Sequence, residues 1–197
     1  MAKVLFINPV VREEDEPRHV PYGIALLAAI AMLGGHQVQV YDANAWRLDD
    51  DVLRQVLEAD EWDVVATGGI STTYSHVKKI CQFAKAHAPR STVVVGGGLL
   101  TSIPRDIMTF IPEIDVGVIG EAFLTFSEIL QQADEGRLTP ASVAGIIYRD
   151  AQGGLHFTEP RDLIHNLDDV LPCPAYELFP LEEVTVSSEV EGRPKDT

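Results

Sequence analysis

Residues 93–98 read VVVGGG and form the most informative segment of the chain. Three β-branched apolar residues are typical of a buried strand, and the three glycines end that strand abruptly. Because glycine lacks a Cβ atom, the backbone of such a turn can approach a ligand at the carboxyl edge of an open parallel sheet. Residues 64–69 repeat the pattern as VVATGG. The two strand ends predict one shared ligand-binding crevice, and a tight packing contact at the glycines is the alternative interpretation.

Strands and helices alternate along the first two thirds of the chain. We expect strands at residues 3–9, 37–41, 63–67, 91–95 and 115–119, and helices at 22–33, 50–59, 74–87, 104–110 and 122–133. Short connections in such an alternation imply parallel strands joined by right-handed crossovers. The sequence therefore predicts an α/β, flavodoxin-like (Rossmann-like) doubly wound sheet of five parallel strands in the order 2-1-3-4-5.

The pattern changes after residue 138. Residues 144–149 and 155–158 flank a glycine-containing turn and predict a C-terminal β-hairpin appendage. Prolines and acidic residues punctuate the chain from residue 160, and the periodicity fades after Leu181. We therefore expect a ligand-binding domain at 1–138, a hairpin and connector at 139–181, and a linker or disordered tail at 182–197.

Composition excludes several classes of protein. The formal net charge of −15 disfavours nucleic-acid binding. The apolar run at residues 24–33 is too short to span a bilayer. Cys81 and Cys173 are the two cysteines, and they lack metal-ligand spacing, so we expect neither a disulfide framework nor a zinc or iron–sulfur site in this chain. A reducing, cytoplasmic location fits this pattern.

Catalytic motifs are missing from the expected positions. The first strand is not followed by a GxGxxG fingerprint, and the chain contains no GxxxxGK[ST] motif. Ser71 and His76 lack a third member for nucleophilic catalysis. The chain is thus predicted to bind a ligand and to contain no catalytic residues of its own.

Several polar residues follow the predicted strands. The loop after the first strand is longer than a connection needs, which indicates a lid or binding loop, and His19 in it is either a metal ligand or a solvated histidine. The hydroxyls of Ser71, Thr72 and Thr73 either cap the next helix or contact a ligand. Glu121 either contacts the ligand or favours a helix amino end.

Six segments occur in an order that resembles a known family. They are residues 3–9 (KVLFINP), 21–29 (PYGIALLAA), 34–42 (GGHQVQVYD), 93–98 (VVVGGG), 120–121 (GE) and 171–180 (LPCPAYELFP). Together they resemble the N-terminal cobalamin-binding domain of radical S-adenosylmethionine (SAM) proteins. That class contains the anaerobic magnesium-protoporphyrin monomethyl ester cyclase and many methyltransferases.

The resemblance implies that cobalamin lies over the carboxyl edge of the sheet, with its nucleotide tail between the sheet and the flanking helices. The implied cofactor-binding residues are Asn8, Pro9, His19, Tyr22, Gly23, Gly69, Ser71, Thr72, Thr73, Gly96, Gly97, Gly98, Leu99, Gly120 and Glu121.

In the family, a barrel domain follows and holds SAM and a [4Fe–4S] cluster on a CxxxCxxC motif, which this chain lacks. The chain would then be a module, inactive alone, whose partners are that barrel in the same polypeptide and a small-molecule substrate. Methyl transfer and the cyclisation step of bacteriochlorophyll biosynthesis are the implied reactions. The alternative is a degenerate cobalamin-type domain that acts in protein interaction or regulation.

The resemblance also bears on the cobalt ligand. Cobalamin domains of the methionine-synthase type use Asp-x-His-x-x-Gly, in which the histidine is the lower axial ligand. Here Asp15, His19 and Gly23 have wider spacing. We therefore expect base-off cobalamin with a weak or water lower ligand, and His19 stays a candidate cobalt ligand.

Overall fold

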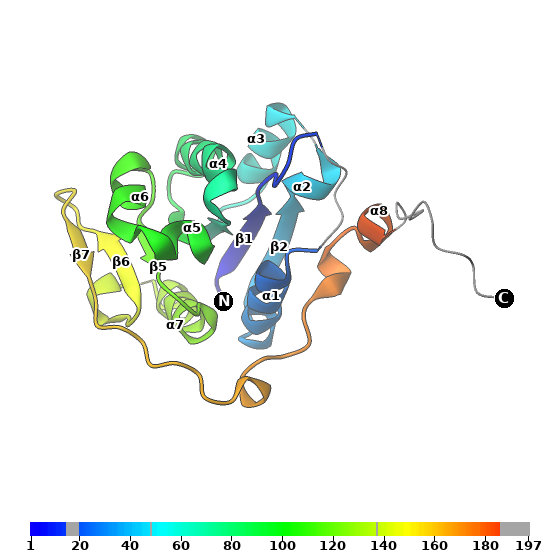
Figure 1. Ribbon diagram of the computed structural model, residues 1–197. Helices are drawn as coiled ribbons and strands as arrows, with labels where there is room; N and C mark the ends of the chain where they lie inside the picture. Colours follow the sequence, from blue (N-terminus) through cyan, green and yellow to red (C-terminus); the bar gives the residue numbers. More distant parts are fainter. Residues whose placement is uncertain (15–19, 48, 137, 186–197) are drawn as a thin grey trace.

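The computed structural model describes residues 1–14, 20–47, 49–136 and 138–185. In these residues a single sheet has the strand order β2-β1-β3-β4-β5-β6-β7 (Figure 1). Its parallel strands are β1 (Lys3–Asn8), β2 (Gln37–Asp42), β3 (Val64–Gly68), β4 (Thr92–Gly96) and β5 (Val116–Val118). The predicted fold class and the order 2-1-3-4-5 are confirmed.

The predicted hairpin is present as β6 (Ile146–Arg149) and β7 (Leu155–Phe157). Strand β6 pairs antiparallel with β5, and β7 pairs antiparallel with β6. The hairpin therefore continues the main sheet at its β5 edge.

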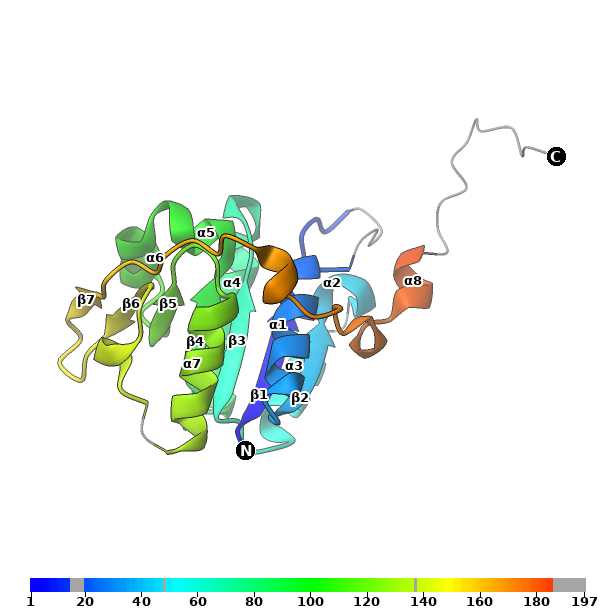
Figure 2. The same ribbon diagram turned by 90° about the horizontal axis from the view of Figure 1, so that it is seen from below.

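Helices cover both faces of the sheet (Figure 2). On one face lie α1 (Tyr22–Leu33) and α7 (Phe123–Asp134), and on the other lie α3 (Asp50–Glu58), α4 (Tyr74–His87), α5 (Gly97–Ser102) and α6 (Pro104–Phe110). Both faces of the sheet are apolar and need cover, as strand β1 illustrates, because its apolar side chains alternate between the two faces. Leu5 and Ile7 pack with α3 to α6, whereas Val4 and Phe6 pack with α1 and α7.

The structure also contains short helices that the sequence pattern does not predict. They are α2 (Ala43–Trp46), α5, α8 (Leu181–Thr185) and the 3₁₀ turns η1 (Ser71–Thr73), η2 (Pro140–Ser142), η3 (Leu167–Asp169) and η4 (Tyr176–Leu178). Helix α8 falls at the start of the segment expected to be a linker. The rest of that segment, residues 186–197, lies outside the described residues. Among the described residues, no helix combines the length and apolarity needed to cross a bilayer.

The connector after the hairpin returns across the face that carries α7 and α1 (Figure 2). Arg161 donates to the hydroxyl of Thr125 at 2.7 Å and pairs with Glu128, both on α7. Further along, the amide of Ala175 donates to the carbonyl of Ala25 in α1 at 3.0 Å. The connector is therefore packed on this face, and the domain boundaries at 138 and 181 stay predictions.

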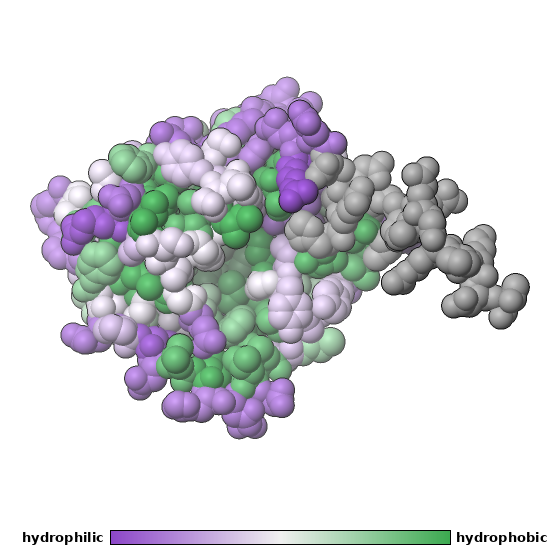
Figure 3. All heavy atoms as spheres, in the orientation of Figure 1, coloured by the Kyte–Doolittle hydropathy of each residue, from purple (hydrophilic) through white to green (hydrophobic). Residues whose placement is uncertain are grey.

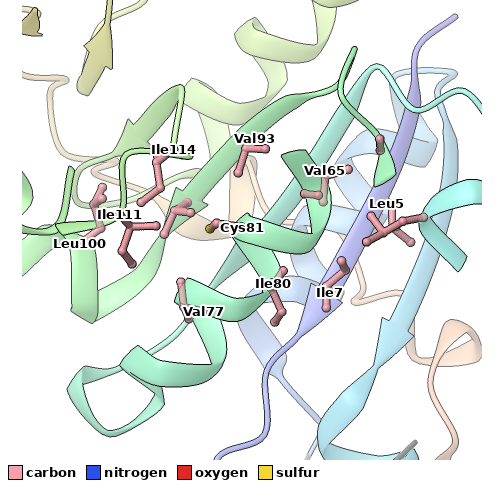
Figure 4. Packing of buried hydrophobic residues seen from close by; sticks show 14 of the residues in the cluster. Leu5, Ile7, Val65, Val77, Ile80, Cys81, Val93, Leu100, Ile111 and Ile114 are labelled. Atoms are coloured by element: carbon pink, nitrogen blue, oxygen red, sulfur yellow. The ribbon is translucent and has the colours of Figure 1, made fainter. Parts of the chain in front are cut away.

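The two cysteines differ in burial. Cys81 belongs to α4, and its side chain lies in the core between that helix and the sheet (Figure 4), whereas Cys173 is exposed. Burial, aided by the nearby charges of Glu113 and Asp115, raises the pKa of the Cys81 thiol well above its usual range.

Only the thiolate reacts with disulfide reagents, so we expect one thiol per folded chain to react with Ellman's reagent at pH 8, and two in denaturing urea. A Cys173→Ser variant should show no fast-reacting thiol. Equal reaction rates of both cysteines in the folded chain would contradict the described packing of Cys81.

Candidate functional site

A cavity of about 640 Å³ lies at the carboxyl edge of the sheet, between the amino ends of α1 and α7. The carboxyl ends of β1, β3 and β4 and the residues that follow β5 border it. Figure 3 shows the hollow near the centre of this face, with apolar residues inside it. This position agrees with the crevice that the glycine-ended strands predict.

The innermost part of the cavity is apolar. Along each parallel strand, the residue two positions before the edge points to the same face as the edge residue and lies deeper. We call the six side chains that line this part the deep wall: Phe6, Leu27, Ala66, Val94, Val118 and Phe126. The rings of Phe6 and Phe126 pack with their centres 5.3 Å apart. The deep wall was not predicted as part of the site.

Two glycine turns pack backbone against backbone at the edge. The carbonyl of Gly69 accepts from the amide of Leu99 at 2.8 Å. Gly97 has a φ of +81°, and a Cβ atom there would come within 2.8 Å of that same carbonyl oxygen. A Cβ atom at Gly68 would lie 2.6 Å from the carbonyl oxygen of Gly96. The glycines therefore serve the packing contact as well as lining the cavity.

Two other glycines border open space. A Cβ atom at Gly23 or Gly120 would meet no heavy atom within 4 Å. Gly23 lies in the first turn of α1, and Gly120 follows β5 with a φ of +75°. The amide of Gly120 donates to the hydroxyl of Thr101 at 3.1 Å, which ties this turn to α5. These two positions keep the entrance of the cavity wide.

The structure brings most of the predicted site residues together. Those that line the cavity are Asn8, Pro9, Tyr22, Gly23, Gly69, Thr73, Gly96, Gly97, Gly98, Gly120 and Glu121. Ser71 and Thr72 are exposed and do not line it, and the Leu99 side chain packs in the opposite core. His19 lies outside the described residues.

Polar side chains at the edge already have partners. The hydroxyl of Thr73 donates to the carbonyl of Ile70 at 2.8 Å and makes no capping bond to α4. The hydroxyl of Thr67 donates to the carbonyl of Ile7 at 2.8 Å. Glu121 precedes α7, and its carboxylate accepts from the amide of Ile164 at 3.3 Å. Thr73 therefore does not cap α4, and Glu121 lies next to the amino end of α7, one residue before its N-cap Ala122.

A buried polar network holds the start of the loop after β1. Asn8 donates to the carboxylate of Asp42 at 2.7 Å, and the same carboxylate oxygen accepts from the first turn of α2. The side-chain oxygen of Asn44 accepts from the amide of Val11 at 2.9 Å, and Arg47 donates to the carbonyl of Asn44 at 2.7 Å. Helix α2 therefore holds Val11 at the cavity wall.

An Asn44→Ala variant should loosen this loop. Removing the acceptor leaves the Val11 amide unpaired, which costs about 1–2 kcal/mol locally. We expect faster hydrogen exchange at Val11 and earlier proteolytic cleavage in residues 9–14, with the sheet amides unchanged. Asn44→Asp retains an acceptor and is the matched control. Unchanged exchange at Val11 in Asn44→Ala would contradict the role of α2.

Metal-ligating residues do not gather in the described part of the site. No described group of three or more His, Cys, Asp or Glu side chains is placed to hold a metal ion. The described residues that line the cavity include no histidine.

A family model described as the B12 binding domain matches residues 9–130. The chain belongs to the B12 binding domain family. The match begins at the residue after β1 and runs through most of α7, so it includes most of the elements around the cavity. The resemblance stated from the sequence segments is confirmed.

Curated relatives of this B12 binding domain include two kinds of enzyme. The chain is 29% identical over 163 residues to an uncharacterized methyltransferase of Pyrococcus horikoshii, a match that covers 83% of this chain and 35% of the relative. It is 27% identical over 176 residues to the anaerobic magnesium-protoporphyrin IX monomethyl ester cyclase of Rubrivivax gelatinosus, covering 86% and 32%. The chain thus spans about a third of the length of these relatives.

Solved structures share the fold. The radical SAM methyltransferase TsrM from Kitasatospora setae, solved with cobalamin and a [4Fe-4S] cluster, has a TM-score of 0.71 at 21% identity, covering 84% of this chain and 30% of TsrM. The cobalamin-dependent SAM radical enzyme OxsB, solved with aqua-cobalamin and SAM, has a TM-score of 0.77 at 17% identity, covering 93% and 25%. At these identities the likeness shows the common fold.

Proposed function

We propose that this chain is the cobalamin-binding module of a radical SAM enzyme that transfers a methyl group or closes a ring on a magnesium porphyrin. The observation that carries the proposal is the apolar cavity of about 640 Å³ at the carboxyl edge of a B12 binding domain. The methyltransferase and cyclase relatives support the two candidate reactions. Cyclisation would place the chain in bacteriochlorophyll biosynthesis.

A further domain of the same polypeptide would hold SAM and the [4Fe–4S] cluster, because the chain spans only about a third of its relatives. The small-molecule substrate would then bind mainly to that domain. We also infer a reducing, cytoplasmic setting, since Cys81 and Cys173 are both free thiols.

The residues present fit a cobalamin. The deep wall offers apolar surface for the aromatic base at the end of the nucleotide tail, and Gly23 and Gly120 leave its entrance free of side chains. Bound cobalamin would supply a cobalt ion that carries a methyl group or assists radical chemistry.

This chain's own part is to bind and orient the cofactor. The deep wall would keep water from the tail, and the turns at Gly69 and Gly97 would border the cofactor without side chains. The network of Asn8 and Asp42 stiffens the end of β1 beside the cavity. None of these residues needs to exchange a proton with a substrate, which agrees with a binding module.

Titration of the 197-residue chain with hydroxocobalamin tests the proposal. We expect one equivalent to bind, with a change in the visible spectrum and a heat of binding in calorimetry. A spectrum identical to free hydroxocobalamin, with no heat, would overturn it. Retained affinity for a separately produced barrel domain in that case would favour the interaction or regulatory alternative.

We further propose that no histidine of the chain ligates the cobalt from below. His19 stands at a spacing that differs from Asp-x-His-x-x-Gly, and no histidine is among the described lining residues. His19→Ala should therefore leave the visible spectrum of the bound cofactor unchanged. A shift of the cobalt absorption bands in this variant, relative to His165→Ala on the connector, would assign His19 as a ligand.

A further inference from the structure

The deep wall provides no side-chain hydrogen-bonding group. All six of its side chains are hydrocarbon, and they come from four strands and two helices. The strand backbones behind them are paired in the sheet, and the backbone amides of Leu27 and Phe126 are paired within α1 and α7. The first-turn amides of these two helices have no intrahelical partner, and they lie nearer the edge. A ligand group that reaches this depth therefore meets apolar surface on every described side.

Four polar lining side chains lie nearer the edge and are engaged, and a fifth, Tyr22, is exposed in the first turn of α1. Asn8 ends β1 and donates to Asp42, while Thr67 and Thr73 donate to backbone carbonyls. Glu121 is exposed and accepts an amide of the connector. The partners of these four side chains all lie outside the deep wall, so a ligand that relied on the four would have to break existing contacts.

The contrast between the apolar deep wall and the polar edge affects which form of the cofactor fits the cavity. The cobamides are the natural forms of this cofactor. A polar group that moves from water to an apolar site without a new partner loses its hydrogen bonds, whereas an apolar group gains by burial. Natural cobamides share the corrin ring and differ in the lower base at the end of the nucleotide tail. Dimethylbenzimidazole and phenol bases are mainly hydrocarbon. Adenine has two ring nitrogens more than dimethylbenzimidazole, an exocyclic amino group, and no methyl groups.

We propose that the deep wall selects cobamides by their lower base, accepting a benzimidazole or phenol base and rejecting a purine. The proposal rests on the proposed function, because it requires the nucleotide tail to enter this cavity. Leaving even one or two polar groups of adenine unpaired should weaken binding roughly tenfold or more relative to cobalamin.

Binding of four corrinoids to the 197-residue chain tests the selection. Calorimetry would compare cobalamin, a cobamide with a p-cresol base, a cobamide with an adenine base, and cobinamide, which lacks the nucleotide. We expect cobalamin and the cresol form to bind within a few-fold of each other, and the adenine form to bind roughly tenfold more weakly or worse. Cobinamide should also bind more weakly than cobalamin.

The outcomes separate the two proposals. If no corrinoid binds, the proposed function fails and this inference falls with it. If cobalamin binds and the adenine form binds as tightly or more tightly, the proposed function stands and the selection is overturned. Equal affinity for cobinamide and cobalamin also overturns it, because the tail would then gain nothing from the cavity.

A single added hydroxyl tests the role of the deep wall itself. Ala66 is 5% exposed and lies in the middle of the wall, so Ala66→Ser places one hydroxyl there with little added volume. The preference for cobalamin over the adenine form should shrink several-fold. Ala86→Ser, at an exposed position of α4 on the other face of the sheet, should leave the preference unchanged. An undiminished preference in a folded Ala66→Ser chain would contradict this role.

Discussion

Gly23→Leu should weaken cobalamin binding by roughly tenfold to a hundredfold without unfolding the chain. A Cβ atom at Gly23 meets no heavy atom within 4 Å, and this residue borders the cavity. The leucine side chain would therefore enter space that the nucleotide tail needs, and overpacking of this kind costs about 1–3 kcal/mol. Leucine is also a better helix former than glycine, so the free energy of unfolding should not fall.

Calorimetric titration of the variant with hydroxocobalamin measures the loss. Gln55→Leu is the matched control, because it adds the same side chain to an exposed position of α3 on the opposite face of the sheet. The control should bind like the unaltered chain. If Gly23→Leu binds hydroxocobalamin with unchanged affinity, the cofactor does not occupy the space beside the amino end of α1.

The second large effect is expected at Gly97, where Ala should lower the free energy of unfolding by about 2–4 kcal/mol. Two costs add at this position. The φ of +81° is unfavourable for any residue with a Cβ atom, and the new Cβ would lie 2.8 Å from the carbonyl oxygen of Gly69. Since that carbonyl accepts from the amide of Leu99, relief of the clash disturbs the bond that joins the two turns.

Gly153→Ala separates these two costs. Gly153 lies in the turn between β6 and β7 with a φ of +85°, and a Cβ atom there would meet no heavy atom within 4 Å. The control should therefore lose about 1 kcal/mol, the conformational cost alone. Urea unfolding of both variants gives the comparison. Equal losses would show that the close approach of Gly97 to Gly69 does not contribute to stability.

The longer elements of the fold could be predicted because their apolar spacing and their flanking residues agree. The helices Tyr22–Leu33, Tyr74–His87 and Pro104–Phe110 have the bounds that the sequence predicts. The five predicted parallel strands differ from the observed ones by at most one residue at each end, and the first hairpin strand begins two residues later than predicted. Burial of an amphipathic face dominates such elements, and it leaves a periodic signal in the sequence.

The short helices α2 and α5 could not be predicted in this way. Each spans at most six residues, too few for a periodic signal. Helix α2 depends on Asp42, whose carboxylate accepts from the amide of Ala45 at 3.0 Å. Helix α5 depends on the bond from Leu99 to Gly69, which joins residues thirty positions apart. Contacts of this kind become visible only in the folded chain.

The edge of the site was predictable, and its depth was not. Glycines at the strand ends indicate where the edge of the site lies. The strands of a parallel sheet are apolar on both faces, so their sequence does not show which face borders a cavity. Ala66 and Val94 of the deep wall therefore look like the core residues Val65 and Val93 beside them. The deep-wall residues of the strands could have been found by counting back from the edge, because each stands two positions before the edge residue of its strand. Ser71 and Thr72 do not line the cavity, because a 3₁₀ turn exposes their side chains.

A crystal structure of the chain grown with hydroxocobalamin would show whether the cavity at the carboxyl edge holds the cofactor. We predict electron density for the lower base between α1 and α7, in contact with Phe6, Ala66 and Phe126, and for the corrin ring above the turns at Gly69 and Gly97. Density for the cofactor at any other place on the chain, or a deep wall closed by side-chain movement beside a bound corrin, would contradict the account.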